Sequence, residues 1–329
     1  MGFSFGALKK PFLCLAPMEE VTDTVFRQIV AKVARPDVFF TEFANVDGVV
    51  HAINNSPSDP SLNLREGRYV HPVLQRLVFT ETERPIVAQI WGKDPKNFYE
   101  ATKLIKRLRF DGVNINMGCP EKDVVKNGCC IALINNRGLA AEIIAAVKDG
   151  AGKLPVSVKT RIGLDKIITE DWCGFLLEQK IDALTVHGRT AKEKSDVPAH
   201  WDEIAKVVSL RNQSKSKTVI IGNGDVKDFL DAKSKLQIAN VDGAMIGRGI
   251  LENINAFNAQ PATLSPQENV NLLREHLKLW EKTWGNTKNF AIMKKFVKAY
   301  IKGWEGAGEL RAKLMNSTSV SQAIDTLTT

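Results

Sequence analysis

Eight short apolar runs, separated by stretches with helical periodicity, constrain the fold of this 329-residue chain more than any other feature. Aliphatic and β-branched residues dominate the runs, as is typical of parallel strands covered by helices. The runs are residues 12–18, 38–43, 85–91, 112–118, 155–163, 183–189, 218–224 and 243–249. Helical patterns lie between most of them, at residues 97–109, 138–149, 171–180 and 201–210. Eight βα units predict an α/β fold, the (β/α)8 TIM barrel.

An open, doubly wound sheet is the alternative, because periodicity alone separates the two arrangements poorly. The residues at the ends of the runs favour the barrel. Seven runs end in APM, TEF, AQIWG, NMGCP, VKTRIG, HGRT or GNGD, and GRG completes the last. Barrel enzymes build their sites from the C-terminal ends of all their strands, whereas an open sheet concentrates its site at one crevice.

The chain changes character after Gln260, where strand patterns give way to helical ones. Ser265 to Glu268 has the form of a capping box with proline in the first turn, and a second helix is expected at residues 289–302. We predict a barrel domain over residues 1–255 and a C-terminal all-helical domain over residues 262–329. The second helix would present a basic face of Lys294, Lys298 and Lys302, opposite an apolar face of Phe296, Tyr300 and Trp304.

Charge and cysteine content narrow the class of protein. The formal charge of +8 favours a polyanionic partner, although a basic protein without such a partner is a common alternative. Residues 282–304 hold six lysines and no acid, which favours a binding surface over a solvated helix face. The five cysteines form no CxxC pair, so we expect reduced thiols in the cytoplasm and no metal site. No run approaches the roughly eighteen apolar residues of a membrane span, and we expect a monomer without a membrane partner.

Two glycine-containing turns occupy the places where barrels commonly hold a phosphate. Asn223, Gly224 and Asp225 follow the seventh run, and Gly247 and Arg248 follow the eighth. Exposed backbone N–H groups in such turns bind anions. Purely structural turns are the alternative, and the presence of both motifs together favours a bound phosphate.

Lys159 ends a run that reads as buried, where an unpaired ammonium would be costly. It should therefore face a ligand or an internal acid, and near a flavin its charge would stabilise the anionic reduced ring. Gln89, Asn116 and His187 end neighbouring runs and could hydrogen-bond the same cofactor, although a histidine satisfied by backbone looks the same in sequence. Cys119 follows the fourth run. With an ordinary pKa near 8.5 its thiol suits a proton donor, and an inert buried cysteine is the alternative.

Ordered sequence blocks across nearly the whole chain resemble the tRNA-dihydrouridine synthases, particularly their bacterial members. The blocks are APMEEVTDTVFR (residues 16–27), TEF (41–43), QIWGKDP (89–95), INMGCPEKDV (115–124), SVKTRIG (157–163), VHGRT (186–190), GNGD (222–225), MIGRG (245–249) and YIKGWEGAGELRAKLM (300–315).

The resemblance implies a tightly bound FMN, NADPH as reductant, and reduction of the C5=C6 bond of specific uridines in tRNA. Cys119 would give a proton to C5 while hydride passes from flavin N5 to C6. A uridine inside folded tRNA must be flipped out to react, so a second domain that grips the RNA is expected. Substrate contacts are expected from Arg189, Lys294, Lys298 and Lys302, and cofactor contacts from Pro17, Met18, Gln89, Asn116, Lys159, His187, Asn223, Gly224, Asp225, Gly247 and Arg248.

One position departs from the family pattern. Cys129 and Cys130 replace the small residues usual about eleven positions after the catalytic cysteine. They could reshape the Cys119 loop or add a second reactive thiol. Two rival functions account for part of the sequence: an FMN barrel reductase of a free small molecule, such as a dihydroorotate dehydrogenase, and an RNA-binding factor whose flavin site is vestigial.

Overall fold

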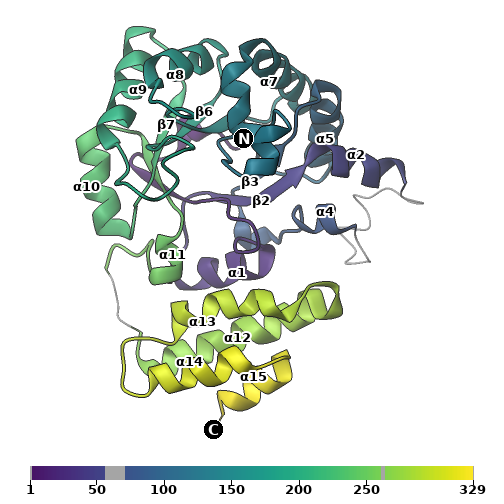
Figure 1. Ribbon diagram of the computed structural model, residues 1–329, viewed down its shortest axis with the longest axis vertical. Helices are drawn as coiled ribbons and strands as arrows, with labels where there is room; N and C mark the ends of the chain where they lie inside the picture. Colours follow the sequence, from purple (N-terminus) through teal and green to yellow (C-terminus); the bar gives the residue numbers. More distant parts are fainter. Residues whose placement is uncertain (1, 56–70, 261–263, 329) are drawn as a thin grey trace.

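The computed structural model describes residues 2–55, 71–260 and 264–328. Eight parallel strands form one sheet in the order β1-β8-β7-β6-β5-β4-β3-β2 (Figure 1). Their bounds are β1 (Phe12–Leu15), β2 (Phe39–Asn45), β3 (Ile86–Trp91), β4 (Gly112–Met117), β5 (Val156–Arg161), β6 (Ala183–His187), β7 (Val219–Asn223) and β8 (Gly243–Ile246).

The sheet closes on itself between its first two strands. An isolated parallel bridge joins Cys14 to Val38, and the Leu15 N–H donates to the Val38 carbonyl at 3.1 Å. β1 also pairs with β8, so each strand has a neighbour on both sides. The predicted TIM barrel is confirmed, and the open doubly wound sheet is wrong.

Helices follow the strands and cover the outside of the barrel (Figure 1). The predicted patterns correspond to α5 (Pro95–Arg107), α7 (Arg137–Ala151), α8 (Thr169–Glu178) and α9 (Trp201–Gln213). The others around the barrel are α1 (Thr24–Val33), α2 (Val46–Asn54), α4 (Pro72–Gln75), α6 (Lys122–Lys126), α10 (Phe229–Ala239) and α11 (Gly249–Glu252).

Within the described ranges, no single helix has the length and apolar character of a membrane span. One pair of segments, Lys122–Asn135 and Arg137–Ala151, meets the length and composition test only when taken together, with a bend of 91° between them.

Most strands end before or within the polar motifs that were assigned to them. β1 ends at Leu15, two residues before Pro17, and β8 ends at Ile246, before Gly247. Likewise β6 ends at His187, before Arg189. Ladder hydrogen bonds stop where the chain leaves the ring toward the next helix, whereas an apolar run in sequence has no such marker. The motif residues therefore lie at the strand ends or on the loops of the barrel mouth.

The C-terminal segment consists of α12 (Pro266–Trp284), α13 (Lys294–Tyr300), α14 (Ala307–Asn316) and α15 (Val320–Thr326), grouped together beside the barrel (Figure 1). The capping box is confirmed: Ser265 Oγ accepts from the Glu268 N–H, and the Glu268 carboxylate accepts from the Ser265 N–H. The predicted domain boundary at residues 255–262 falls partly on residues 261–263, which lie outside the described residues.

The second C-terminal helix is shorter than predicted. Instead of one helix over residues 289–302, a 3-10 turn (Phe290–Met293) precedes α13, and α13 ends at Tyr300. Ile301 leaves helical geometry, and Gly303 has a φ of +83°, a left-handed conformation that favours glycine. Lys302 therefore lies beyond the helix that carries Lys294 and Lys298, and the predicted helix over residues 289–302 is wrong in its extent.

The C-terminal helices pack on the barrel through α1 and α11. Phe26 of α1 contacts His276 of α12 and Phe296 of α13, with ring centroids 5.7 and 4.7 Å away. Asp23, which caps α1, accepts a hydrogen bond of 2.7 Å from Trp284 Nε1. These contacts place the C-terminal helices at the ends of β1 and β2.

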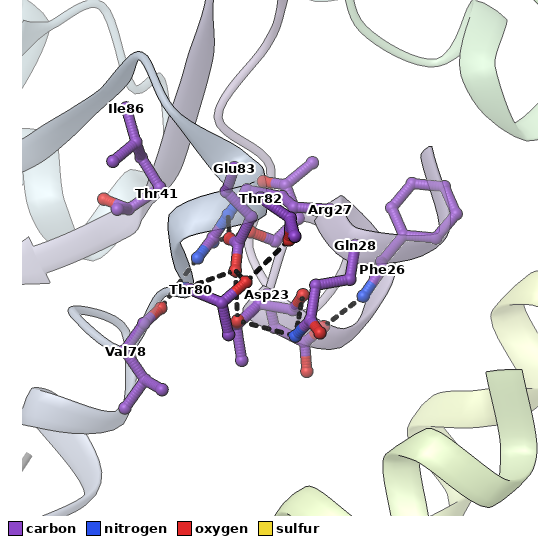
Figure 2. Close-up of polar contacts among 12 residues, drawn as sticks. Asp23, Phe26, Arg27, Gln28, Thr41, Val78, Thr80, Thr82, Glu83 and Ile86 are labelled. Carbon is purple, nitrogen blue, oxygen red and sulfur yellow. Dashed lines mark hydrogen bonds and ion pairs between the residues drawn. The ribbon is translucent and has the colours of Figure 1, made fainter. Parts of the chain in front are cut away.

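A buried ion pair fixes α1, as Figure 2 shows. Arg27 Nε lies 2.6 Å from Glu83 Oε2, and both side chains are fully buried. The remaining guanidinium N–H groups donate to the Thr22 and Val78 carbonyls, and Glu83 also accepts from Thr24 Oγ1 at 2.6 Å. With both charges hydrogen-bonded, this pair fixes the helix on which the C-terminal segment packs.

Candidate functional site

A ladder of buried amides crosses the interior of the barrel between β3 and β5. Gln89 Nε2 donates to Asn114 Oδ1 at 2.7 Å, and Asn114 Nδ2 donates to Ser157 Oγ at 2.8 Å. Asn116 Nδ2 donates back to Gln89 Oε1 at 3.1 Å. Gln89 is thus almost fully buried and bonded to protein amides on both sides, and its main observed role is to orient Asn116.

The Cys119 loop is held by Asn116 and Arg161. Asn116 Oδ1 accepts from the N–H groups of Gly118 and Cys119, each at 3.0 Å. Arg161 Nε donates to the Gly118 carbonyl at 2.9 Å, and its NH1 group donates to the Thr190 carbonyl. These bonds hold the loop that carries the thiol over the ends of β4 and β5.

Cys130, the second residue of the unusual Cys129–Cys130 pair, interacts with the thiol of Cys119. A hydrogen bond with the Cys130 thiol is the main cause that lowers the pKa of Cys119 to about 7, and the charge of Arg161 adds to it. Burial and the same interaction raise the pKa of Cys130. The thiol of Cys119 therefore does not keep its ordinary pKa, contrary to the expectation from sequence. Cys130 has a φ of +53°, which explains why a small residue suits this position.

Lys159 lies in register with Asn116 on one side and Thr185 on the other. Its ammonium forms no ion pair with any residue in the described part of the chain, so the alternative of an internal salt bridge is not seen there. Burial and the charge of Arg161 lower the pKa of Lys159 to about 7, and the nearby Cys119 sulfur opposes that shift. An unpaired, buried amine at a strand end is the arrangement expected where an anionic ligand completes the site.

Four basic residues surround His187 at the ends of β5, β6 and β8. Burial lowers the pKa of His187, and the charges of Arg161, Lys159, Arg189 and Arg248 lower it further, so the imidazole is neutral at pH 7. We call these four residues the mouth cations. Asp225 and Glu193 are the carboxylates that interact with them.

The two glycine-containing turns meet His187 and the mouth cations. Asn223 Nδ2 donates to the Met245 carbonyl at 2.9 Å and ties the seventh strand to the eighth. Gly224 has a φ of +125°, and a Cβ there would lie 2.6 Å from that of Ala199, so only glycine fits. A Cβ at Gly247 would meet only Ala16 and Met18 Sδ, at 3.7 and 3.9 Å, which leaves room beside its backbone for a ligand.

Arg189 has a structural role that the sequence did not indicate. Its side chain is almost fully buried, and it donates to Asp225 at 2.5 Å and to the Val197 carbonyl at 2.6 Å. These bonds hold Arg189 against Asp225 in the turn at residues 223–225. The expected contact of Arg189 with the substrate stays a prediction. Arg248, with its side chain 67% exposed and 4.0 Å from Asp225, is the mouth cation open to a ligand. Pro17 and Met18 follow β1, with Met18 next to Gly247.

Four of the six lysines in residues 282–304 are paired with acids of the barrel: Lys288, Lys295, Lys298 and Lys302. Lys298 and Lys302 lie 3.7 and 3.9 Å from the carboxylate of Glu252 in α11. Lys295, not predicted as a site residue, pairs with Glu20. For these four lysines the acids missing from residues 282–304 are supplied across the interface, although the Lys298 side chain stays 71% exposed. Lys294 is partly buried.

Arg161 and Asn114 belong to the site and were not identified from sequence. Arg161 falls within the quoted SVKTRIG block, and its alternation with Lys159 on one strand was a usable signal, because residues two apart lie on one face. Asn114 shares the same relation with Asn116 on β4. Within the described residues, no group of three or more His, Cys, Asp or Glu is placed to hold a metal ion.

Comparison with known proteins decides the family. The dihydrouridine synthase family model matches residues 14–329. The chain belongs to the dihydrouridine synthase family. It is 43% identical over 321 residues to a "Probable tRNA-dihydrouridine synthase" of Staphylococcus aureus (strain COL), covering 96% of this chain and 92% of that protein. It is 41% identical over 317 residues, with the same coverage, to the "Probable tRNA-dihydrouridine synthase 2" of Bacillus subtilis (strain 168).

Solved structures share the barrel of this dihydrouridine synthase family member at low sequence identity. Morphinone reductase in complex with tetrahydroNAD superimposes with a TM-score of 0.53 at 13% identity, covering 81% of this chain and 92% of that chain. A variant of NCR from Zymomonas mobilis gives 0.52 at 17% identity, covering 87% and 97%. At such identities the likeness concerns the fold alone.

Proposed function

We propose that this member of the dihydrouridine synthase family reduces the C5=C6 bond of specific uridines in tRNA to 5,6-dihydrouridine, with FMN as its tightly bound cofactor and NADPH as reductant. One observation carries the proposal: the unpaired Lys159 amine lies beside Asn116 and near the Cys119 thiol, at the mouth of a barrel of this family. Names of relatives supply the substrate class.

The mouth fits FMN by its charge and by its open backbone. Lys159 would compensate a reduced, anionic isoalloxazine ring, and Gln89 and Asn116 offer amides beside it. Arg248 and the turns at Asn223–Asp225 and Gly247 would hold the phosphate, because the mouth cations have few carboxylates to compensate them. When bound and reduced, FMN supplies the hydride that the uracil ring receives at C6.

The protein supplies the proton and its placement. Asn116 and Arg161 fix the backbone of the Cys119 loop, so the thiol is held ready to protonate C5. Proton transfer leaves a thiolate, and the Cys130 thiol is placed to donate a hydrogen bond to that sulfur. Arg161 adds a positive charge nearby. These groups stabilise the charge that develops on Cys119.

The division of labour between the two parts of the chain belongs to the same proposal. Residues 1–255 would hold FMN and carry out the chemistry, and residues 262–329 would grip tRNA. Lys294 and Lys298 remain candidates for phosphate contacts, which position RNA without reading its sequence. Lys302 is a weaker candidate, because it shares Glu252 with Lys298 and also donates to the Glu252 carbonyl.

The test is reduction of tRNA by the purified protein. We expect a yellow protein that, with NADPH, forms dihydrouridine in unmodified tRNA and leaves free uridine and dihydroorotate unchanged. Turnover of free pyrimidines or enones without RNA would favour a small-molecule reductase instead. A colourless protein that binds tRNA would favour an RNA-binding factor. Mapping dihydrouridine in tRNA from cells that lack and then regain the gene would identify the modified position.

A further inference from the structure

A cavity of about 260 Å³ lies between the rim of the barrel and the C-terminal helices. The loop after β1, the strand β2 and the helix α4 form one wall. The other wall is formed by α12, α13 and the segment between them. It is separate from the barrel mouth, since its lining includes neither Cys119 nor Lys159 nor any residue of the turns at 223–225 and 247–248. Exposed residues at its edge, Glu20, Pro72 and Asn289, connect it to solvent.

Two buried polar atoms of opposite character in its lining have no hydrogen-bond partner. Glu42 Oε2 and Trp280 Nε1 are both unbonded, and the two residues are only 2% and 3% exposed. The other oxygen of Glu42 is used, since it accepts from the Glu20 N–H at 2.6 Å. The nearest cation, Lys288 Nζ, is 3.8 Å from Glu42 Oε2, beyond hydrogen-bond distance.

Leaving such atoms unbonded is costly, which points to a ligand that completes them. A buried donor or acceptor without a partner keeps the full cost of its desolvation. The contrast within α12 is instructive: Trp284, one turn further on, donates its N–H to Asp23 at 2.7 Å. The N–H of Trp280, a residue that lines the cavity, has no such acceptor. The missing partner must accept from an indole N–H and donate to a carboxylate.

The charges of the lining exclude a phosphate and favour a neutral, flat ligand. Three carboxylates, Glu20, Asp23 and Glu42, face two cations, Arg76 and Lys288. Arg76 is bound to Glu19, and Lys288 lies 3.3 Å from Asp23, so neither is free for an anion. The rest of the lining includes apolar side chains of α12, α13 and the preceding turn: Trp280, Ile292 and Phe296.

We propose that this cavity binds a nucleobase of the tRNA other than the uracil that is reduced, with Glu42 accepting from a ring N–H and Trp280 donating to a neighbouring carbonyl. Guanine and uracil carry an N–H beside a carbonyl on one edge. Aromatic side chains with such polar partners are the usual means by which proteins bind unstacked RNA bases. The inference rests on the proposed function, since it takes tRNA as the substrate. It gives the interface a role in recognising RNA as well as in joining the two parts of the chain.

Photo-crosslinking of the full-length protein tests the position of the base directly. Two tRNA transcripts would be made, one carrying 4-thiouridine and one carrying 6-thioguanosine, and neither with any other modified nucleoside. Each would be irradiated with the wild-type protein, and the crosslinked peptides would be mapped by mass spectrometry. We expect a crosslink from one of the two transcripts to the peptides that contain Trp280 or Ile292. Crosslinks confined to peptides of the barrel mouth, from both transcripts, would overturn the proposal.

Two conservative variants test the hydrogen bonds. Trp280→Phe removes the indole N–H and leaves a smaller aromatic ring in its place. Glu42→Gln keeps an acceptor oxygen for the Glu20 N–H and replaces the unbonded Oε2 with an amide NH2 group. Each should weaken tRNA binding about tenfold while the protein stays folded. Glu281→Gln, an exposed residue next to Trp280 on the same helix, is the matched control and should bind as the wild type does.

The outcomes separate this proposal from the function on which it rests. If wild-type protein fails to bind tRNA, the proposed function itself fails. If the wild type binds tRNA and both variants bind it with the wild-type affinity, the proposal is wrong. The cavity then holds only ordered water, which also satisfies buried polar groups. If Glu42→Gln unfolds, Trp280→Phe and the crosslinking still decide the matter.

Discussion

The barrel mouth and the C-terminal helices both carry clustered positive charge, but the two regions use it differently. On the helices, Lys295, Lys298 and Lys302 pair with carboxylates of the barrel. In the mouth, Lys159 has no ion pair among the described residues. The three arginines beside it, Arg161, Arg189 and Arg248, interact with two carboxylates, Asp225 and Glu193. A run of lysines without nearby acids in the sequence therefore need not be unpaired in the structure, because acids from another part of the chain can pair with them. The charge most available to a ligand lies in the mouth.

The largest effect that sharpens this comparison should come from the thiol in the mouth. Cys119→Ala removes the proton donor and should lower single-turnover formation of dihydrouridine by about 100-fold or more. FMN content and oxidation of NADPH should persist, since the residue does not hold the cofactor. Rapid-quench measurement of dihydrouridine, with flavin content from absorbance, checks this. Product formation at the wild-type rate would remove the cysteine from the mechanism.

A matched pair of lysine variants tests the comparison most directly. Lys159→Met removes the unpaired charge and should weaken FMN retention or slow flavin reduction by about 10- to 100-fold. Lys298→Met removes a charge already shared with Glu252 and should leave both properties unchanged. Desalting followed by flavin absorbance, and stopped-flow reduction by NADPH, measure the two effects. Equal behaviour of the two variants would contradict the distinction between the regions.

Reversal of the helix lysines should give a moderate effect that depends on salt. Changing Lys294, Lys298 and Lys302 to Glu should weaken tRNA binding and reduce the slope of affinity against salt concentration. Because two of the three share Glu252, we expect about a tenfold loss, less than three free phosphate contacts would give. Filter binding at several salt concentrations tests it. Unchanged affinity at low salt would make this surface an interface with the barrel only.

The smallest expected effect concerns pH. Cys119 gives its proton only while it is a thiol, so single-turnover reduction should fall as pH rises through about 7, the lowered pKa of this group. The Cys130 hydrogen bond is its main cause. Cys130→Ala should therefore move the inflection upward by on the order of one pH unit, toward the ordinary value near 8.5. Cys130→Ser, which keeps a donor, is the control, and identical pH profiles for all three proteins would rule out the coupling.

The sequence contained the barrel because each strand is specified locally. Runs such as β5 are apolar and β-branched, and a residue two positions away, as with Lys159 and Arg161, lies on the same face. The capping box of α12 is likewise a local signal and was found where predicted. Most strand ends were placed too late, since a run such as residues 12–18 continues in apolar residues after β1 ends at Leu15. The end of β3 was placed correctly, and that of β2 too early.

The sequence by itself determined the fold class, the family and the residues that gather at the mouth, because βα units and motif spacing are local properties of the chain. Only the tertiary structure decided which charges are free. Glu252 meets Lys298, Asp225 meets Arg189, and Cys130 meets Cys119 across gaps in sequence that carry no periodic signal. The same is true of Glu42 and Trp280, whose unbonded atoms meet only once the C-terminal helices pack on α1. Pairing and burial depend on which elements pack together, and that is a property of the whole fold.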